Sequence, residues 1–194
     1  MTSLNPYEVA ALVAATLERL QIPYVIGGSV ASSIHGEMRT TMDVDFAVHI
    51  RGDRAALLER ALSREFHVDH ESIREAVASR RLFNAIHLVS MTKIDFHVCP
   101  ETGIYAEQIR RGQLLRIASD PEALARVATP EDIVLQKLLW YRMGDCSSDR
   151  QWRDLVGVLK QKSAAIDAQY LGRWGRELGL QSLLARAMRQ AGLD

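Results

Sequence analysis

The sequence predicts an α+β fold in which a mixed β-sheet flanked by helices is followed by a helical subdomain. Two observations carry this prediction. Short apolar or alternating segments mixed with helical periodicity occupy residues 1–128, whereas only helical periodicity follows in residues 129–194. The change comes at Thr129-Pro130, where a Thr cap and a Pro at the first helical position mark a strong helix start. We therefore expect a mixed α/β domain over 1–128 and a helical subdomain over 129–194.

Capping residues, alternation and apolar periodicity give the expected elements. Asn5 as the cap and Pro6 at the first position begin a helix that ends at residues 21–23. The other expected helices are 29–35, 53–65, 71–79, 101–111 and 130–143, followed by helices with breaks near Ser163 and Gly179. The expected strands are 24–26, 44–50, 66–69, 83–89, 93–98 and 114–117, with a hairpin through the polar residues 90–92.

The composition fits a folded domain and excludes several classes of protein. The 194-residue chain is 47% hydrophobic and 25% charged, which is typical of globular rather than disordered chains. No apolar run reaches the roughly 20 residues of a membrane span, and the N-terminus lacks a secretion signal, so we expect a cytoplasmic protein. Two Cys exclude a disulfide framework or a four-cysteine zinc site. Lys+Arg and Asp+Glu both number 24, so net charge gives no general support for nucleic-acid binding.

Three carboxylates in the first domain indicate a site for divalent cations. Alternation places Asp43 and Asp45 on one side of a strand, roughly 7 Å apart along the backbone. Two carboxylates so placed repel each other unless they are solvated, protonated or neutralised by cations. With Asp95 from a neighbouring strand they form an all-oxygen cluster, which suits Mg²⁺ or Mn²⁺. Two such ions about 3.5–4 Å apart would clamp the attacking and leaving oxygens of a phosphoryl-type displacement.

A glycine pair between a strand and a helix supplies the expected anion site. Gly27 and Gly28 let the backbone approach a phosphate closely, and Ser29 begins a helix whose N–H groups and dipole favour an anion. Taken singly, a Gly-Gly pair is most often a turn, and an Asp-x-Asp pair is usually a solvated strand end. The combination with Asp95, each motif at the end or on one face of a strand, favours a functional site.

The order of these motifs resembles the nucleotidyltransferase superfamily of the DNA-polymerase-β type. The stretch Arg39-Thr40-Thr41-Met42 before the Asp pair resembles the bacterial branch related to abortive-infection (AbiE-type) toxin nucleotidyltransferases. Segments 136–142 and 150–155 match a helical motif of that branch, except that Gln151 stands where the branch has Asp. The resemblance covers about residues 20–160 and implies a minimal nucleotidyltransferase fold.

The resemblance implies a role for each carboxylate. Asp43 and Asp45 would bind both metal ions, and Asp95 would bind the catalytic metal and help to deprotonate the attacking hydroxyl. His97 shares the face of Asp95 and either supports the metal ligands or is an ordinary strand histidine.

The resemblance also implies which residues bind the nucleotide. Gly27, Gly28 and Ser29 would hold its phosphates. Lys137 would reach the triphosphate from the helical subdomain, or is an ordinary surface Lys. Arg39 would contact phosphate, or pairs with an acid.

The expected function is a metal-dependent nucleotidyltransferase that moves a nucleoside monophosphate from an NTP, such as ATP, to a hydroxyl and releases pyrophosphate. The acceptor stays open among an RNA end in a toxin–antitoxin pair, a protein side chain and a small molecule such as an aminoglycoside. Basic residues interspersed with acids predict that any RNA acceptor is held through a small footprint. The rival is a catalytically silent binding module of the same fold, which need not retain three carboxylates. Base preference and oligomeric state stay open.

Overall fold

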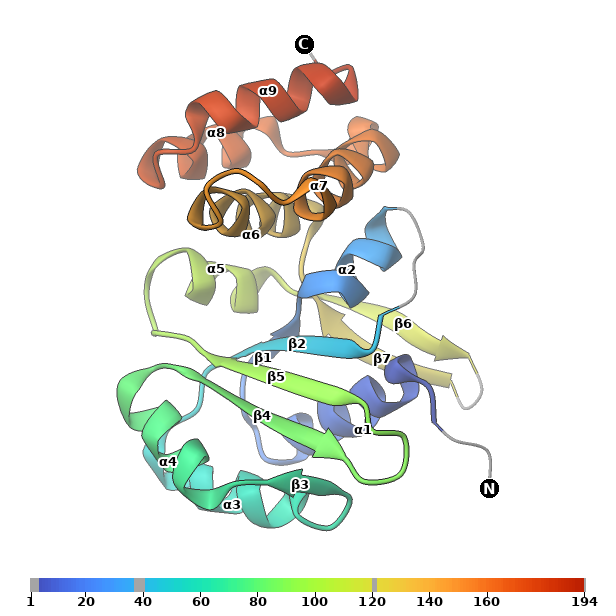
Figure 1. The fold of residues 1–194 in the computed structure, drawn as a ribbon, viewed down its shortest axis with the longest axis vertical. Coiled ribbons are helices and arrows are strands. Elements are labelled where there is room, and N and C mark those ends of the chain that lie inside the picture. The colour runs from blue at the N-terminus through green and yellow to red at the C-terminus, as the bar shows by residue number, and fades with distance from the viewer. Residues whose placement is uncertain (1–3, 37–40, 120–121, 194) are drawn as a thin grey trace. The chain divides into compact units, whose positions relative to one another are not determined.

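The structure is a computed structural model that describes residues 4–36, 41–119 and 122–193 of the 194-residue chain. Its strands form one sheet of mixed direction with the spatial order β3-β4-β5-β2-β1-β7-β6 (Figure 1). The strands are β1 (Tyr24–Ile26), β2 (Asp43–Val48), β3 (Phe66–Val68), β4 (Leu82–His87), β5 (Lys93–Val98), β6 (Gln113–Ser119) and β7 (Glu122–Val127). The predicted mixed sheet flanked by helices is confirmed.

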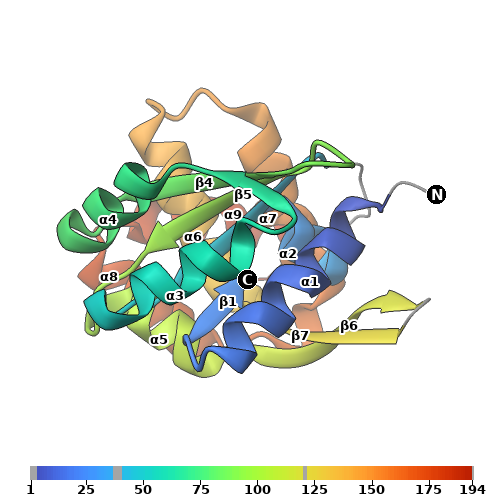
Figure 2. The ribbon, with the colours of Figure 1, turned by 90° about the horizontal axis from the view of Figure 1, so that it is seen from below.

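Helices account for most of the remaining chain. They are α1 (Pro6–Arg19), α2 (Gly28–His35), α3 (Gly52–Leu62), α4 (His70–Ser79), α5 (Gly103–Arg111), α6 (Pro130–Met143), α7 (Asp149–Gln161), α8 (Ala168–Glu177) and α9 (Gln181–Ala191), with a short 3-10 helix η1 (Ser163–Ala165). Figure 2 shows α1 and α3 over one face of the sheet, and Figure 1 shows α5 on the other face.

Local sequence signals set several of these helix ends. The Asn5 side chain accepts hydrogen bonds from the N–H groups of Tyr7 (2.9 Å) and Glu8 (3.1 Å), and Glu8 accepts one from the Asn5 N–H (2.6 Å). This capping box satisfies N–H groups that have no partner inside the helix. At α6, the Thr129 hydroxyl accepts a hydrogen bond from the Asp132 N–H (3.3 Å) and donates one to Asp132 Oδ2 (2.9 Å). Both predicted starts are confirmed.

The pairing of β2 with β5 sets the register that matters for the site. The two strands run parallel, with Asp45 opposite Asp95 and Phe46 opposite Phe96. The Phe46 and Phe96 rings stack with centroids 5.7 Å apart, and both side chains are fully buried. Because successive strand residues point to opposite faces, this aromatic packing fixes both Asp side chains on the other face of the sheet.

One strand was not predicted from the sequence. Residues 122–127 (Glu-Ala-Leu-Ala-Arg-Val) consist largely of good helix formers, and only 114–117 was expected to be a strand in this region. In the structure the segment forms β7, which pairs antiparallel with β6 and parallel with β1. Ala125 and Val127 are fully buried there, so burial against neighbouring strands outweighs the local helix propensity.

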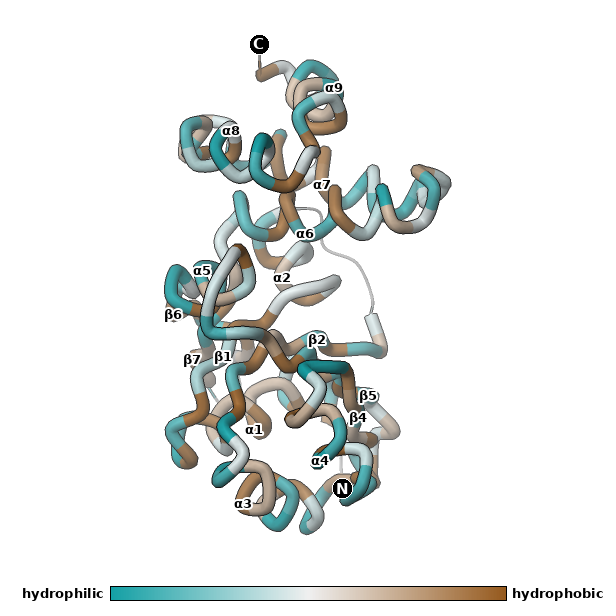
Figure 3. Tube along the Cα trace, turned by 90° about the vertical axis from the view of Figure 1, so that its left-hand side faces the viewer, coloured by the Kyte–Doolittle hydropathy of each residue, from teal (hydrophilic) through white to brown (hydrophobic). Residues whose placement is uncertain are grey.

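The chain divides into two compact units, as far as the structure describes them. One combines Met1–Val30 and Thr40–Ala128, and the other combines Ala31–Arg39 and Thr129–Asp194. Within the second unit, α6 packs against α7 and α8, and α7 packs against α9. Hydrophobic and hydrophilic residues alternate around α7, α8 and α9 (Figure 3), as in amphipathic helices. In the described part of the chain, no helix combines the length and hydropathy needed to cross a bilayer.

Candidate active site

Two carboxylates face each other across neighbouring strands in the first unit. Asp45 of β2 and Asp95 of β5 are paired in parallel register, so their Cα atoms belong to strands about 4.8 Å apart. Their side chains are 19% and 14% exposed, respectively. Asp43 lies two residues earlier on the same face and is exposed. The structure therefore brings the three predicted carboxylates to one face at one end of β2 and β5.

Two basic side chains from β5 contact these carboxylates. The Lys93 ammonium lies 2.8 Å from Oδ1 and 2.9 Å from Oδ2 of Asp95. His97 Nε2 lies 3.4 Å from Asp45 Oδ1. The hydrogen bond that Lys93 donates to Asp95 raises the pKa of Lys93, and the charges of Asp95, Asp43 and Asp45 raise it further, while burial acts against them. The Lys93 ammonium therefore interacts electrostatically with all three carboxylates.

The glycine pair packs directly against Asp45. The Gly27 N–H donates to the Asp45 carbonyl oxygen (2.9 Å). Gly28, the first residue of α2, has φ +55°, and a Cβ built on it would lie 1.8 Å from Asp45 Oδ2. Only glycine combines this φ with so close an approach. Ser29 follows in the first turn of α2, so the positive end of that helix starts beside the carboxylate cluster.

Two further residues, Arg39 and Lys137, were predicted to contact phosphate. Arg39 lies outside the described residues. Lys137 belongs to the second unit, where it is 2% exposed and donates to Asp154 Oδ2 (2.8 Å) and Gln151 Oε1 (3.0 Å). Gln151, at the position where the resembling family has Asp, supplies an amide oxygen to the same lysine.

Lys93 is a residue of this cluster for which the sequence motifs predict no role. The signal that points to it is strand alternation, which places Lys93, Asp95 and His97 on one face of the same strand. What the sequence does not contain is the contact itself, because the i and i+2 residues of a strand need not turn toward each other.

The three carboxylates are chemically suitable ligands for a hard divalent cation. Carboxylate oxygens are the ligands that Mg²⁺ and Mn²⁺ prefer, and Asp43, Asp45 and Asp95 supply only such oxygens. Among the described residues, however, no three His, Cys, Asp or Glu side chains converge as a formed metal site. Asp95 is instead in contact with the Lys93 ammonium, so the cluster already accommodates a positive charge.

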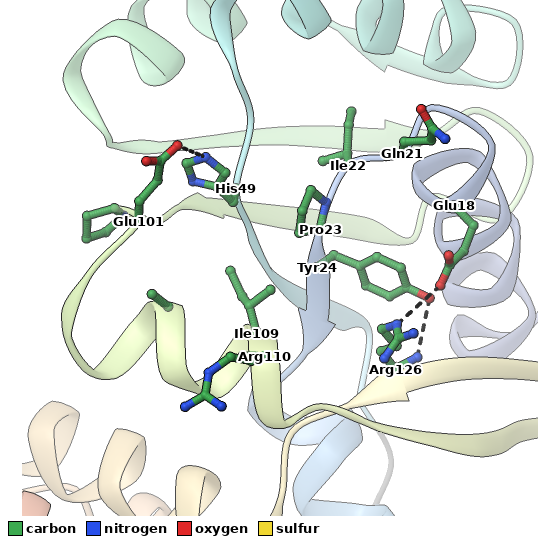
Figure 4. A pocket seen from close by; sticks show the side chains of 12 residues that line it. Glu18, Gln21, Ile22, Pro23, Tyr24, His49, Glu101, Ile109, Arg110 and Arg126 are labelled. Carbon is green, nitrogen blue, oxygen red and sulfur yellow. Dashed lines mark hydrogen bonds and ion pairs between the residues drawn. The ribbon is translucent and has the colours of Figure 1, made fainter.

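A cavity of about 750 Å³ lies at the opposite end of the central strands (Figure 4). Tyr24, which begins β1, lines it together with Glu18, Arg126, His49 and Glu101. Two pairs of lining residues contact each other: Glu18 lies 3.6 Å from Arg126, and His49 Nε2 lies 2.8 Å from Glu101. Because β1 runs from Tyr24 toward the glycine pair, this cavity is separated from the carboxylates by the length of the strand.

Comparison with known proteins supports the fold. No protein-family model matches the chain, and no curated protein matches it. The solved structure of an antigenic nucleotidyltransferase-like protein from Paracoccidioides brasiliensis is similar over 97% of this chain and 95% of that chain, with TM-score 0.58 and 16% identity. The antibiotic-resistance factor ANT(2'')-Ia is similar over 94% of this chain and 96% of that chain, with TM-score 0.57 and 14% identity. The fold is therefore nucleotidyltransferase-like, as the sequence motifs predicted.

Proposed function

We propose that this chain is a metal-dependent nucleotidyltransferase that transfers a nucleoside monophosphate from an NTP to a hydroxyl and releases pyrophosphate. The observation that carries the proposal is the placement of Asp45 opposite Asp95, with Gly28 and the start of α2 packed against Asp45. Carboxylates for cations and a helix start for phosphates thus lie side by side. The nucleotidyltransferase-like fold supports the same reading.

The chain's own residues would divide the work as follows. Asp43, Asp45 and Asp95 would hold two Mg²⁺ or Mn²⁺ ions, which when bound neutralise phosphate charge and activate the attacking oxygen. Asp95 would also accept the proton of the acceptor hydroxyl. The backbone at Gly28 and the Ser29 hydroxyl would orient the triphosphate so that the acceptor oxygen approaches in line.

Lys137 could bind a nucleotide only after it gives up its present hydrogen-bond partners. Its ammonium donates to Asp154 and Gln151, so it would contact a triphosphate only by exchanging these partners for phosphate oxygens. The same proposal for Arg39 rests on its place just before the Asp pair in the sequence.

For the acceptor, we propose an RNA end, as in AbiE-type toxins, in a toxin–antitoxin setting within the cytoplasm. The supporting features are residues 39–42 before the Asp pair and the helical residues around Lys137 and Asp154. A small-molecule hydroxyl is the second candidate, because the fold is similar to the antibiotic-resistance factor ANT(2'')-Ia over nearly the whole of both chains. A protein hydroxyl is the third.

The test is transfer of label from each of the four α-³²P-NTPs to a cell lysate, with Mg²⁺ or Mn²⁺ supplied separately. Nuclease, protease and size filtration then identify the labelled class. Asp45→Asn should abolish transfer, whereas Asp53→Asn, which alters an exposed Asp near the start of α3, should not. Nucleotide binding by the wild type without any transfer would instead favour the catalytically silent module.

A further inference from the structure

We propose that Lys93 is an internal counter-cation, which offsets the charge of Asp95 in the metal-free protein and competes with a divalent cation for that carboxylate. The inference rests on the proposed function, because it assumes that Asp95 is a metal ligand. It adds a role for a residue to which neither the motifs nor the resemblance assigned one.

The geometry of the contact makes the lysine a competitor of a metal ion at Asp95. The ammonium lies within 2.9 Å of both carboxylate oxygens. These are the lone pairs that a divalent cation would use. A carboxylate offers about four lone-pair sites on its two oxygens, but a metal ion that chelates both oxygens of Asp95 would take the place that the ammonium holds. Such binding requires that the Lys93 contact opens.

Strand pairing explains why the empty cluster needs a cation. Asp45 and Asp95 are directly opposite each other in parallel register, and Asp43 is opposite Lys93 itself. Like charges directly opposite on neighbouring strands are destabilising. The Lys93 ammonium lies 2.8 Å from Asp95 Oδ1 and 2.9 Å from Asp95 Oδ2, between these like charges and solvent. Lys93 therefore stabilises the folded protein when no metal is present.

The lysine is also free to move. Its side chain is 42% exposed, and the four-carbon stem of lysine carries a flexible, strongly hydrated charge. Release of the ammonium into solvent consequently requires no rearrangement of β5, whose Ile94 and Phe96 are fully buried in the core. The free-energy cost of binding a metal ion at Asp95 is then chiefly the loss of the Lys93–Asp95 ion pair.

The experiment measures Mn²⁺ affinity directly, by the electron paramagnetic resonance signal of free Mn²⁺, in full-length protein without nucleotide. Lys93→Met and Lys93→Gln remove the charge, and Lys93→Arg keeps it. Arg81→Met is the matched control, because Arg81 is an exposed cation of the same unit. It directly precedes Leu82, the first residue of β4, which pairs with His97 at the opposite end of β5 from Lys93. Titrations in about 0.5 M tetramethylammonium chloride screen through-space effects of charge removal.

We expect both neutral variants to bind Mn²⁺ about ten- to a hundred-fold more tightly than the wild type, the range for a hydrogen bond to a charged group. Arg81→Met should change the affinity less than twofold, and Lys93→Arg should not tighten it. In EDTA, the neutral variants should melt at a lower temperature than the wild type, and Mn²⁺ should raise their melting temperature by more.

Unchanged or weaker Mn²⁺ binding by both neutral variants, with clear binding by the wild type, would overturn the role of Lys93 and leave the proposed metal site standing. If neither the wild type nor any variant binds Mn²⁺, the metal site of the proposed function fails together with this inference.

Discussion

Gly28→Ala should damage the site far more than it damages the fold. Gly28 has φ +55°, and the new Cβ would lie 1.8 Å from Oδ2, 2.5 Å from Cγ and 2.9 Å from Cβ of Asp45. Contacts under 3.0 Å essentially never occur for a real Cβ. The Asp45 carboxylate must therefore rotate away, and its oxygen must retreat by about 1.2 Å to reach even 3.0 Å.

Two separate effects follow from this geometry. A left-handed backbone conformation costs an alanine about 1–2 kcal/mol of stability. Displacement of a catalytic carboxylate by about 1 Å is worth on the order of a hundredfold in rate. We thus expect a loss of about 1–3 kcal/mol in the free energy of unfolding and about a hundredfold loss of nucleotidyl transfer.

Gly103→Ala separates the two effects. Gly103 begins α5 with φ +79°, and a Cβ there would meet nothing within 4 Å. This variant should lose a similar amount of stability in urea unfolding but keep wild-type transfer and Mn²⁺ affinity. Wild-type transfer by Gly28→Ala, or an equal loss of transfer by Gly103→Ala, would refute the argument that the Gly28 backbone positions Asp45.

Three further predictions concern groups outside the carboxylate cluster. Lys137→Met should lower the free energy of unfolding by about 3–5 kcal/mol in urea, because it removes the buried ammonium that lies 2.8 Å from the Asp154 carboxylate, which is 13% exposed; a loss below about 1 kcal/mol would show that the pair contributes little. A thiol reagent at pH 8 should label exposed Cys146 in the native protein and Cys99 only after unfolding, because burial raises the pKa of Cys99 to about 11; rapid labelling of both thiols would contradict this. Burial also raises the pKa of Tyr24 from 10.0 to about 12. The stabilising contribution of the neutral phenol is therefore fully present below pH 10 and is lost as the pH rises to 12. Between pH 10 and pH 12, the wild type should lose roughly 2–3 kcal/mol of stability more than Tyr24→Phe. Parallel losses in the two proteins would be the opposing result.

Local signals in the sequence were sufficient for the elements whose ends depend on neighbouring residues. Asn5 and Thr129 mark helix starts because their side chains bond N–H groups two or three residues ahead. Ser90 fixes the predicted hairpin through His87 Nδ1 and Thr92 Oγ1, each 2.8 Å from its hydroxyl. The strand β7 escaped prediction because its identity comes from pairing with β1 and β6 rather than from its own residues.

The same distinction applies to the site. Alternation alone placed Asp43 and Asp45 on one face, and this was visible in six residues of sequence. The register that sets Asp45 opposite Asp95 joins residues fifty positions apart, so it depends on the packing of the whole sheet. The partners of Lys137 are similarly non-local, because Asp154 lies on a different helix.

Because residues of the α2 segment group with the C-terminal helices, the helical unit is not one continuous stretch of the gene. Gly36, just after α2, is packed so tightly that a Cβ there would lie 3.2 Å from Val158 Cγ2 on α7. A fragment that starts at Thr129 would lack this packing partner, and a fragment that stops at Ala128 would carry it without its counterpart. Expression of either half alone should consequently yield an aggregation-prone polypeptide, and recombination between relatives would exchange the two units intact only through crossovers that also carry residues 31–36.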